Sequence, residues 1–252
     1  MTSIPTGGRF DMGRVVSRTF GVLGANLLPF LLLGAAGAAP RALMLWATRT
    51  YITDPSVAGV LTLPITIVAA LAGCLVQAAI TRKAYQSFSG KDSSFGDMLG
   101  TGVQALFPLF LMSICVGFMV GLSTLAFIVP GFILATRWAA AGPALIVQKL
   151  SPFEAMGRSA DLTKGRRWPI FGLLIAYFLA LAAIEIALVA VSGASLTTFS
   201  KTLNGGLYGL LVVPALNAIT VPITAAGATS IYYELRATRD GFGADTTAAV
   251  FE

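Results

Sequence analysis

The feature that most restricts this chain is a series of long apolar runs separated by short polar segments. The first run, from Asn26 to Trp46, has LLPFLLLGAAGAAP at its centre and only Arg41 as a charged residue. A helix needs about 20 apolar residues to cross a bilayer core of about 30 Å. Five more runs follow, near Pro64–Thr81, Val103–Ile128, Pro130–Val147, Trp168–Val191 and Leu207–Ile231. We therefore predict an all-α membrane protein with six transmembrane helices.

The composition agrees with this prediction and leaves no room for a separate soluble domain. Charged residues make up 11% of the chain, and its mean hydropathy is +0.82. Soluble domains average about 25% charged residues. The first residues, MTSIPTGGRFDMGR, lack the basic, apolar and small-residue order of a cleaved signal, so we expect no removal. We predict a single polytopic membrane domain over residues 1–252.

The basic residues predict the orientation of the chain. Of the 17 Lys and Arg residues, 13 lie toward one predicted membrane face, while Arg41, Arg49 and Lys201 lie toward the other and Arg137 lies within a span. Short basic loops are translocated poorly, so the richer face is cytoplasmic. This places the chain in a bacterial inner membrane with both termini in the cytoplasm. The net charge of +6 then points to anionic lipid headgroups rather than to nucleic acid.

Three segments of the chain begin alike. Each opens with Phe, an acid and Met within four residues and then reaches a Pro at the start of an apolar run; they start at Phe10, Phe95 and Phe153. In the first segment, Met12, Val15, Val16, Phe20 and Leu23 share one helical face. In the third, the residues from Ser151 to Glu154 form a capping box with Pro at the first helical position. Each segment is predicted to be an amphipathic helix that lies in the cytoplasmic interface.

The returning helices also match one another. Pro64, Pro130 and Pro214 each precede a basic or aromatic residue by 19 positions: Lys83, Lys149 and Tyr233. A helix of that length spans about 28 Å, close to the hydrocarbon thickness. We predict that each Pro begins a return helix at the far interface. The whole pattern predicts three repeats, each an interfacial helix plus a transmembrane hairpin, over residues 9–91, 92–150 and 151–240, with a disordered tail over 241–252. Such repeats share an orientation and are expected to be related by a pseudo-threefold axis along the membrane normal.

Residue types exclude several kinds of site. The chain has no histidine, which removes the usual proton carrier, the usual metal and haem ligand, and every triad that contains His. Its two cysteines, Cys74 and Cys115, lie inside apolar runs and are expected to be packing residues. We expect no metal, no cofactor and no catalytic residue.

Three polar residues inside the predicted spans are candidates for a buried site. Arg137 and Glu185 are predicted to lie at a similar depth, so they are expected to face each other and pair, directly or through water. The alternatives are a substrate or ion site and independent contacts with the interface. Asn217 lies in the last span between Pro214 and Pro222. A helix interrupted in this way requires neighbours that bond its freed backbone, or a ligand-lined cavity.

A basic cluster beside an aromatic residue is the candidate for headgroup binding. Lys164, Arg166 and Arg167 precede Trp168 at the start of the fifth apolar run. Ammonium and guanidinium groups pair with phosphate, and an indole ring favours the membrane boundary. Ordinary anchoring of the chain explains the same pattern, so both interpretations stay open.

Several strings resemble a known family. The segment VPGFILATRWAAAGPALIVQKLSPFEAMGRSADLTKGRRWPIFGLL, with FDMGRVVSRTFGVLGANLLPF before it and YYELRATRDG after it, resembles bacterial membrane proteins. These are the proteins related to the membrane domain of glycerophosphoryl diester phosphodiesterases, and the YciC-like uncharacterised membrane proteins. In those phosphodiesterases a separate soluble barrel carries out hydrolysis, and this chain has no such barrel. The resemblance implies a six-helix membrane module, work close to lipid, and no catalytic residues.

These observations lead to three functional hypotheses. The first is a non-enzymatic inner-membrane module that binds or passes a lipid or another amphiphile, or that organises a membrane complex. The second is a transporter of small solutes or peptides with a central cavity lined by Arg137, Glu185 and Asn217. The third is an intramembrane enzyme. Membrane lipids are the expected partners, and a partner membrane protein or a second copy of the chain stays open.

Overall fold

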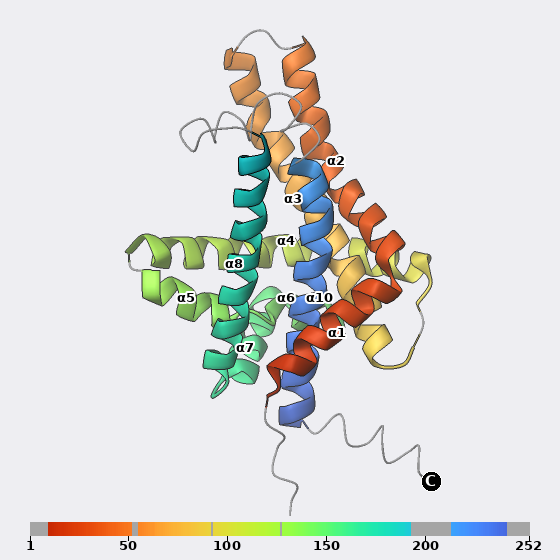
Figure 1. The fold of residues 1–252 in the computed structure, drawn as a ribbon, viewed down its shortest axis with the longest axis vertical. Helices are drawn as coiled ribbons and strands as arrows, with labels where there is room; N and C mark the ends of the chain where they lie inside the picture. The colour runs from red at the N-terminus through yellow and green to blue at the C-terminus, as the bar shows by residue number, and fades with distance from the viewer. Residues whose placement is uncertain (1–9, 52–54, 92, 127, 193–212, 241–252) are drawn as a thin grey trace, which may run out of the picture.

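The computed structural model describes residues 10–51, 55–91, 93–126, 128–192 and 213–240, and this part of the chain is helical with no strand. Figure 1 shows the arrangement of the helices. Their bounds are α1 Met12–Ala25, α2 Leu27–Tyr51, α3 Pro55–Phe88, α4 Phe95–Ala126, α5 Ile128–Arg137, α6 Ala141–Gln148, α7 Pro152–Thr163, α8 Arg167–Ser192 and α10 Val213–Asp240. The all-helical prediction is confirmed for these residues.

Several of these helices are long and apolar enough to cross a membrane. Four stretches qualify alone: Leu27–Met44, Gly59–Phe88, Phe95–Leu125 and Val129–Gln148. Helices α7 and α8, bent by 106° at their junction, qualify as a fifth when they are counted together. Large apolar side chains such as Val60, Phe118 and Leu125 are exposed on their outer surfaces. Extensive exposed apolar surface of this kind requires an apolar surrounding. The chain is a multi-pass membrane protein.

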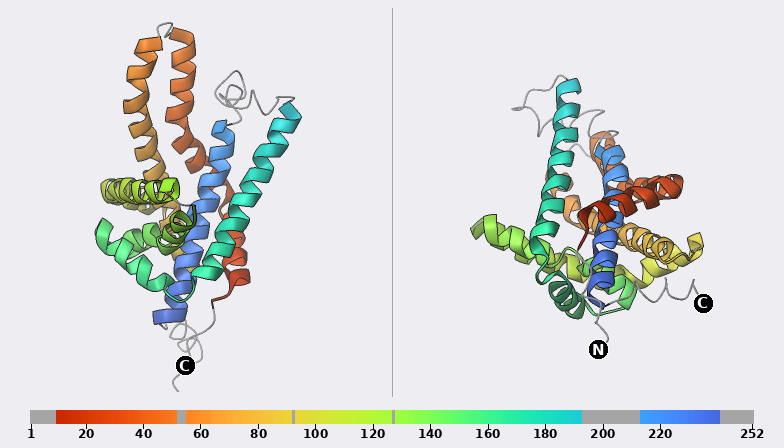
Figure 2. Two further views of the ribbon diagram at one scale, coloured as in Figure 1. Left: turned by 90° about the vertical axis from the view of Figure 1, so that its left-hand side faces the viewer. Right: turned by 60° about the horizontal axis from the view of Figure 1, so that its bottom comes forward.

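The helices run in two directions. Helices α2, α3, α8 and α10 follow the long axis of the molecule, whereas α4 and α5 lie across it (Figures 1 and 2). Helices α1 and α7 lie at one end, beside the C-terminal part of α10, and the end of α2 and the start of α3 lie at the other (Figure 1). We call the end with α1 and α7 the basic end, because Arg14, Arg18 and Arg158 belong to these two helices.

The first and third predicted units begin as the sequence predicts. Helix α1 ends at Ala25, and a new helix starts at Leu27; α7 ends at Thr163, and α8 starts at Arg167. The capping box at the start of α7 is present, with Ser151 and Glu154 bonded reciprocally. Each of these short helices packs part of its apolar face inward, including Val15 of α1 and Met156 of α7, while Phe20 and Phe153 are exposed.

The second predicted unit differs from the prediction. Helix α4 is continuous from Phe95 to Ala126 with Pro108 inside it, so this unit has no separate interfacial helix. Likewise α3 begins at Pro55, and Pro64 lies inside it rather than at its start. A proline removes one backbone hydrogen bond of a helix, but it does not have to end the helix. In α3 and α4 apolar helical residues continue on both sides of the proline. The six spans and the threefold relation stay predictions.

Helix α10 lies at the centre of the packing, and its contact with α2 is very close. A Cβ atom added at Gly34 of α2 would lie 2.2 Å from the carbonyl oxygen of Ala218 on α10. Pro222 stands four residues after Ala218 and has no N–H to donate to that carbonyl. The Ala218 carbonyl therefore lacks its usual partner within α10. It faces Gly34, and only a glycine allows the two backbones to approach so closely.

Candidate functional site

A groove of about 480 Å³ lies where α3, α4 and α10 meet. Its α3 wall contains Ala70, Gly73, Cys74 and Gln77, whose spacing of three and four residues places them on one helical face. Ala70 has only a methyl group as its side chain and Gly73 has none. A Cβ atom added at Gly73 would meet nothing within 4 Å. The volume is within the usual range of about 300–1,000 Å³ for small-molecule sites.

The groove is apolar apart from a few uncharged polar groups. Phe110, Ile114 and Val221 contribute apolar surface, and the polar groups come from Gln77, Ser113, Thr220 and Thr224. The Ser113 hydroxyl donates to the Leu109 carbonyl at 2.8 Å, and the Thr224 hydroxyl donates to the Thr220 carbonyl at 2.7 Å. Each hydroxyl oxygen keeps acceptor capacity after that bond. The Thr224 hydroxyl also contacts the hydroxyl of Tyr177 on α8.

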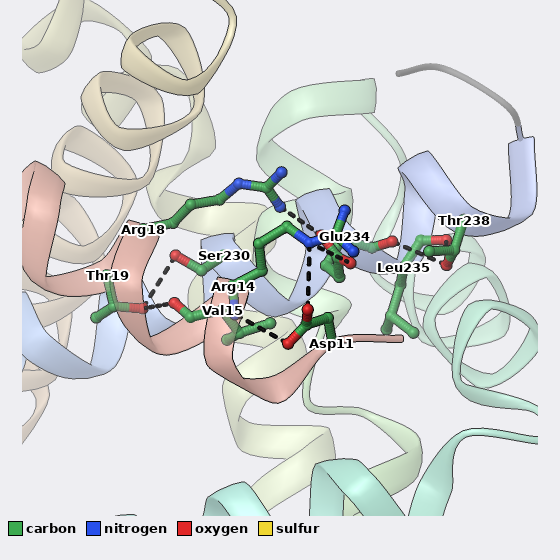
Figure 3. Close-up of polar contacts among 9 residues, drawn as sticks. All are labelled: Asp11, Arg14, Val15, Arg18, Thr19, Ser230, Glu234, Leu235 and Thr238. Atoms are coloured by element: carbon green, nitrogen blue, oxygen red, sulfur yellow. Dashed lines mark hydrogen bonds and ion pairs between the residues drawn. The ribbon is translucent and has the colours of Figure 1, made fainter. Parts of the chain in front are cut away.

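A buried carboxylate fixes α1 on α10 at the basic end. The Glu234 side chain is 1% exposed, and its Oε2 accepts a hydrogen bond from Nη1 of Arg18 at 2.5 Å (Figure 3). Nε of Arg14 lies 3.7 Å from Oε1 of the same carboxylate. A buried charge of this kind requires a partner, and Arg18 supplies it. One turn earlier on α10, Ser230 accepts a hydrogen bond from Thr19 at 3.0 Å.

Aromatic rings extend this contact toward α3 and α6. The Arg18 guanidinium lies 5.0 Å from the centroid of the Tyr233 ring, within the range of a cation–π interaction. The Tyr233 ring packs against Tyr85 of α3 with centroids 5.9 Å apart. Arg236 donates a hydrogen bond to the Tyr85 hydroxyl at 2.8 Å, and Gln148 of α6 donates one to the Tyr232 hydroxyl at the same distance. The segment from Tyr232 to Arg236 therefore joins three neighbouring helices.

The last turn of α10 also holds α7. Arg158 of α7 pairs with Asp240, and Nε of Arg236 lies 3.8 Å from the same carboxylate. Arg166, which precedes α8, donates to the Thr238 carbonyl at 3.4 Å. Asp11 caps α1: its carboxylate accepts a hydrogen bond from the backbone N–H of Arg14. This bond lowers the pKa of Asp11 below its usual value. We call these contacts around Glu234 and Asp240 the α10 clasp; they are structural, because their charges are bonded within the chain.

The predicted headgroup residues lie together at the bend between α7 and α8. Lys164 is exposed, Arg166 and Arg167 are half-buried, and Trp168 is 82% exposed. The bend itself uses Gly165, whose φ of +82° is in the left-handed region. The exposed indole next to basic groups is the arrangement that the sequence predicts for a membrane boundary. Binding of headgroups there stays a prediction.

The predicted buried residues are placed apart from the groove. Arg137 ends α5 with an exposed side chain, and its carbonyl accepts hydrogen bonds from Ser159 and Thr163 of α7. Glu185 is on α8, about 27 Å from the α7 end of that helix at 1.5 Å per residue, and its side chain lies outside the described residues. Asn217 is half-buried and does not line the groove. The Arg137–Glu185 pair stays a prediction, and this placement lends it no support.

Two parts of the candidate site were missed in the sequence. Gln77 and Ser113 line the groove from different helices, and only the packing of α3 against α4 brings them together. Glu234 had a visible signal, since it is an acid that follows Tyr233 and precedes Arg236 just after the last apolar run. The polar residues Thr220 and Thr224, which follow Asn217 in the interrupted span, do line the groove.

Within the described ranges, no group of three or more Asp, Glu or Cys side chains is arranged to hold a metal ion. Comparison with protein-family models, with curated proteins and with solved structures finds no match for this chain. The resemblance in the sequence therefore stays an expectation.

Proposed function

We propose that this chain is a non-enzymatic inner-membrane module that binds or passes a lipid or another amphiphile. The observation that carries the proposal is the groove between α3, α4 and α10, which is mainly apolar. Two of the helices that form it, α3 and α4, contain stretches long and apolar enough to cross a membrane, and both have exposed apolar side chains. A groove in that setting is in contact with lipid chains, so an amphiphile is its natural ligand.

The rival function, a transporter with a central polar cavity, has less support. It requires an aqueous path lined by Arg137, Glu185 and Asn217, and neither Arg137 nor Asn217 lines the groove. A role in organising a membrane complex is compatible with the groove, because exposed faces of α4 are available to a neighbouring protein. The orientation with both termini in the cytoplasm, the six spans with their threefold relation, and headgroup binding by Lys164, Arg166, Arg167 and Trp168 belong to the same proposal.

Native mass spectrometry of the gently extracted protein tests the proposal. The variant Gly73→Leu places a bulky side chain at the groove wall, where an added Cβ atom meets nothing within 4 Å. Gly59→Leu makes the same change on the same helix, also into open space but outside the groove. We expect the wild type and Gly59→Leu to keep a bound lipid and Gly73→Leu to lose it. Equal retention by all three proteins contradicts binding in the groove.

A further inference from the structure

The groove differs from the basic end in its charge. Among the described residues that line it, none is acidic or basic. The nearest charged groups on α10 are those of the α10 clasp, where Glu234 and Asp240 are bonded to arginines. A phosphate, carboxylate or ammonium group in the groove would lose its water and find no opposite charge, which is strongly unfavourable in an apolar setting.

The polar groups of the groove suit a neutral hydrogen-bonding ligand. The hydroxyls of Ser113 and Thr224 already donate to their own helices, so toward the groove they act as acceptors, although the Tyr177 hydroxyl takes one acceptor position of Thr224. The Gln77 amide supplies both a donor and an acceptor. Its nitrogen lies beside the start of α6, 3.3 Å from where a Cβ atom of Gly142 would stand. A ligand hydroxyl can donate to and accept from this set, and a ligand carbonyl can accept from Gln77.

We propose that the groove selects an uncharged amphiphile, with a hydroxyl or an ester carbonyl of the ligand bonded to Gln77 and its chain lying along Gly73 and Ala70. This inference rests on the proposed function, because it names the class of ligand for the same groove. It separates two kinds of membrane component: long-chain alcohols and acylglycerols fit, whereas phosphate-bearing lipids and ionised fatty acids do not. The residues proposed for headgroup binding, Lys164, Arg166, Arg167 and Trp168, are then separate from this ligand site.

The test uses three photoactivatable probes of equal chain length on the full chain in nanodiscs: an alkyl alcohol, the corresponding fatty acid and the corresponding alkane. We expect the alcohol to label peptides of α3, α4 and α10 at least about tenfold more than the ionised acid, since one unfavourable charge outweighs a single hydrogen bond. Lowering the pH through the pKa of the acid neutralises it, so its labelling is expected to rise, while labelling by the alcohol stays constant.

Variants separate failure of this inference from failure of the proposed function. Gln77→Leu is expected to reduce alcohol labelling about tenfold and to leave alkane labelling unchanged, which also shows that the groove is intact. Gly73→Leu is expected to reduce labelling of the groove peptides by all probes to the level of their lipid-facing surface, and Gly59→Leu to leave it unchanged. Equal labelling by alcohol and ionised acid, still sensitive to Gly73→Leu, overturns the neutral-ligand inference alone. If Gly73→Leu leaves the labelling by every probe unchanged, the proposed function is overturned as well.

Discussion

Arg18 on α1 donates a hydrogen bond to the buried carboxylate of Glu234 on α10, which stands 216 residues later in the chain. The two ends of the described chain are thereby joined at the basic end. The bond is asymmetric in its surroundings, since the Glu234 side chain is 1% exposed and the Arg18 side chain is 27% exposed.

This asymmetry predicts unequal effects of removing each partner. Arg18→Ala leaves a buried carboxylate without its main partner, which costs about 3–5 kcal/mol for an uncompensated buried charge. Glu234→Ala leaves an arginine that can turn toward water, so we expect a smaller loss of about 1–2 kcal/mol. Thermal unfolding of the detergent-solubilised variants measures both. Arg14→Ala is the control, because Arg14 is 56% exposed and 3.7 Å from the carboxylate, and we expect a change below about 1 kcal/mol. Equal losses of unfolding free energy for Arg18→Ala and Arg14→Ala would contradict the assignment of Arg18 as the main partner of Glu234.

The close approach of α2 and α10 predicts that Gly34 does not tolerate a side chain. A methyl group there would lie 2.2 Å from the Ala218 carbonyl, so α2 must move away from α10. Overpacking of this kind costs about 1–3 kcal/mol. Gly34→Ala is therefore expected to lower the unfolding temperature. Gly59→Ala, at an open position of α3, is expected to be neutral or stabilising because alanine favours the helix. The account of this contact fails if the two alanine variants unfold alike.

The capping box of α7 predicts a pH dependence. The hydrogen bond from the Ser151 hydroxyl lowers the pKa of Glu154 below its ordinary value of 4.5. The stability that this carboxylate contributes is fully present above that ordinary value and is lost as the pH falls through the lowered pKa. An NMR titration of the Glu154 carboxyl carbon measures the pKa. Ser151→Ala is expected to raise the pKa toward 4.5, and an unchanged titration in that variant would argue against the bond.

The structure makes clear which parts of the fold the sequence could predict. Local signals predicted the starts of α1 and α7, because caps such as Ser151 and Glu154 depend on residues three or four apart. They did not predict that the segment from Phe95 is continuous with the following span in α4 or that α3 begins before Pro64, because a proline's effect depends on what surrounds the freed carbonyl. The sequence could not predict the groove, for a related reason. Gln77, Ser113 and Thr224 belong to three helices, and their distances along the chain say nothing about their packing.

The shared position of α1 and α7 predicts the topology of their basic residues. Arg14→Cys and Arg158→Cys, each in a Cys74→Ser, Cys115→Ser background, are expected to react with a membrane-impermeant maleimide from the same side of the membrane. Thr50→Cys, near the end of α2, is expected to react from the opposite side. Labelling of positions 14 and 158 from opposite sides would contradict the placement of both helices at one end.

The proposed function requires that the groove between α3, α4 and α10 opens into lipid and not into water. The most direct measurement places a nitroxide label at position 73 through Gly73→Cys in the same cysteine-free background, with the protein in nanodiscs. Collisions with apolar oxygen and with a water-soluble nickel complex are then compared by electron paramagnetic resonance. We expect frequent collisions with oxygen and few with nickel. Frequent collisions with nickel would mean that the groove is filled with water, which would rule out a lipid-binding groove and favour a transporter.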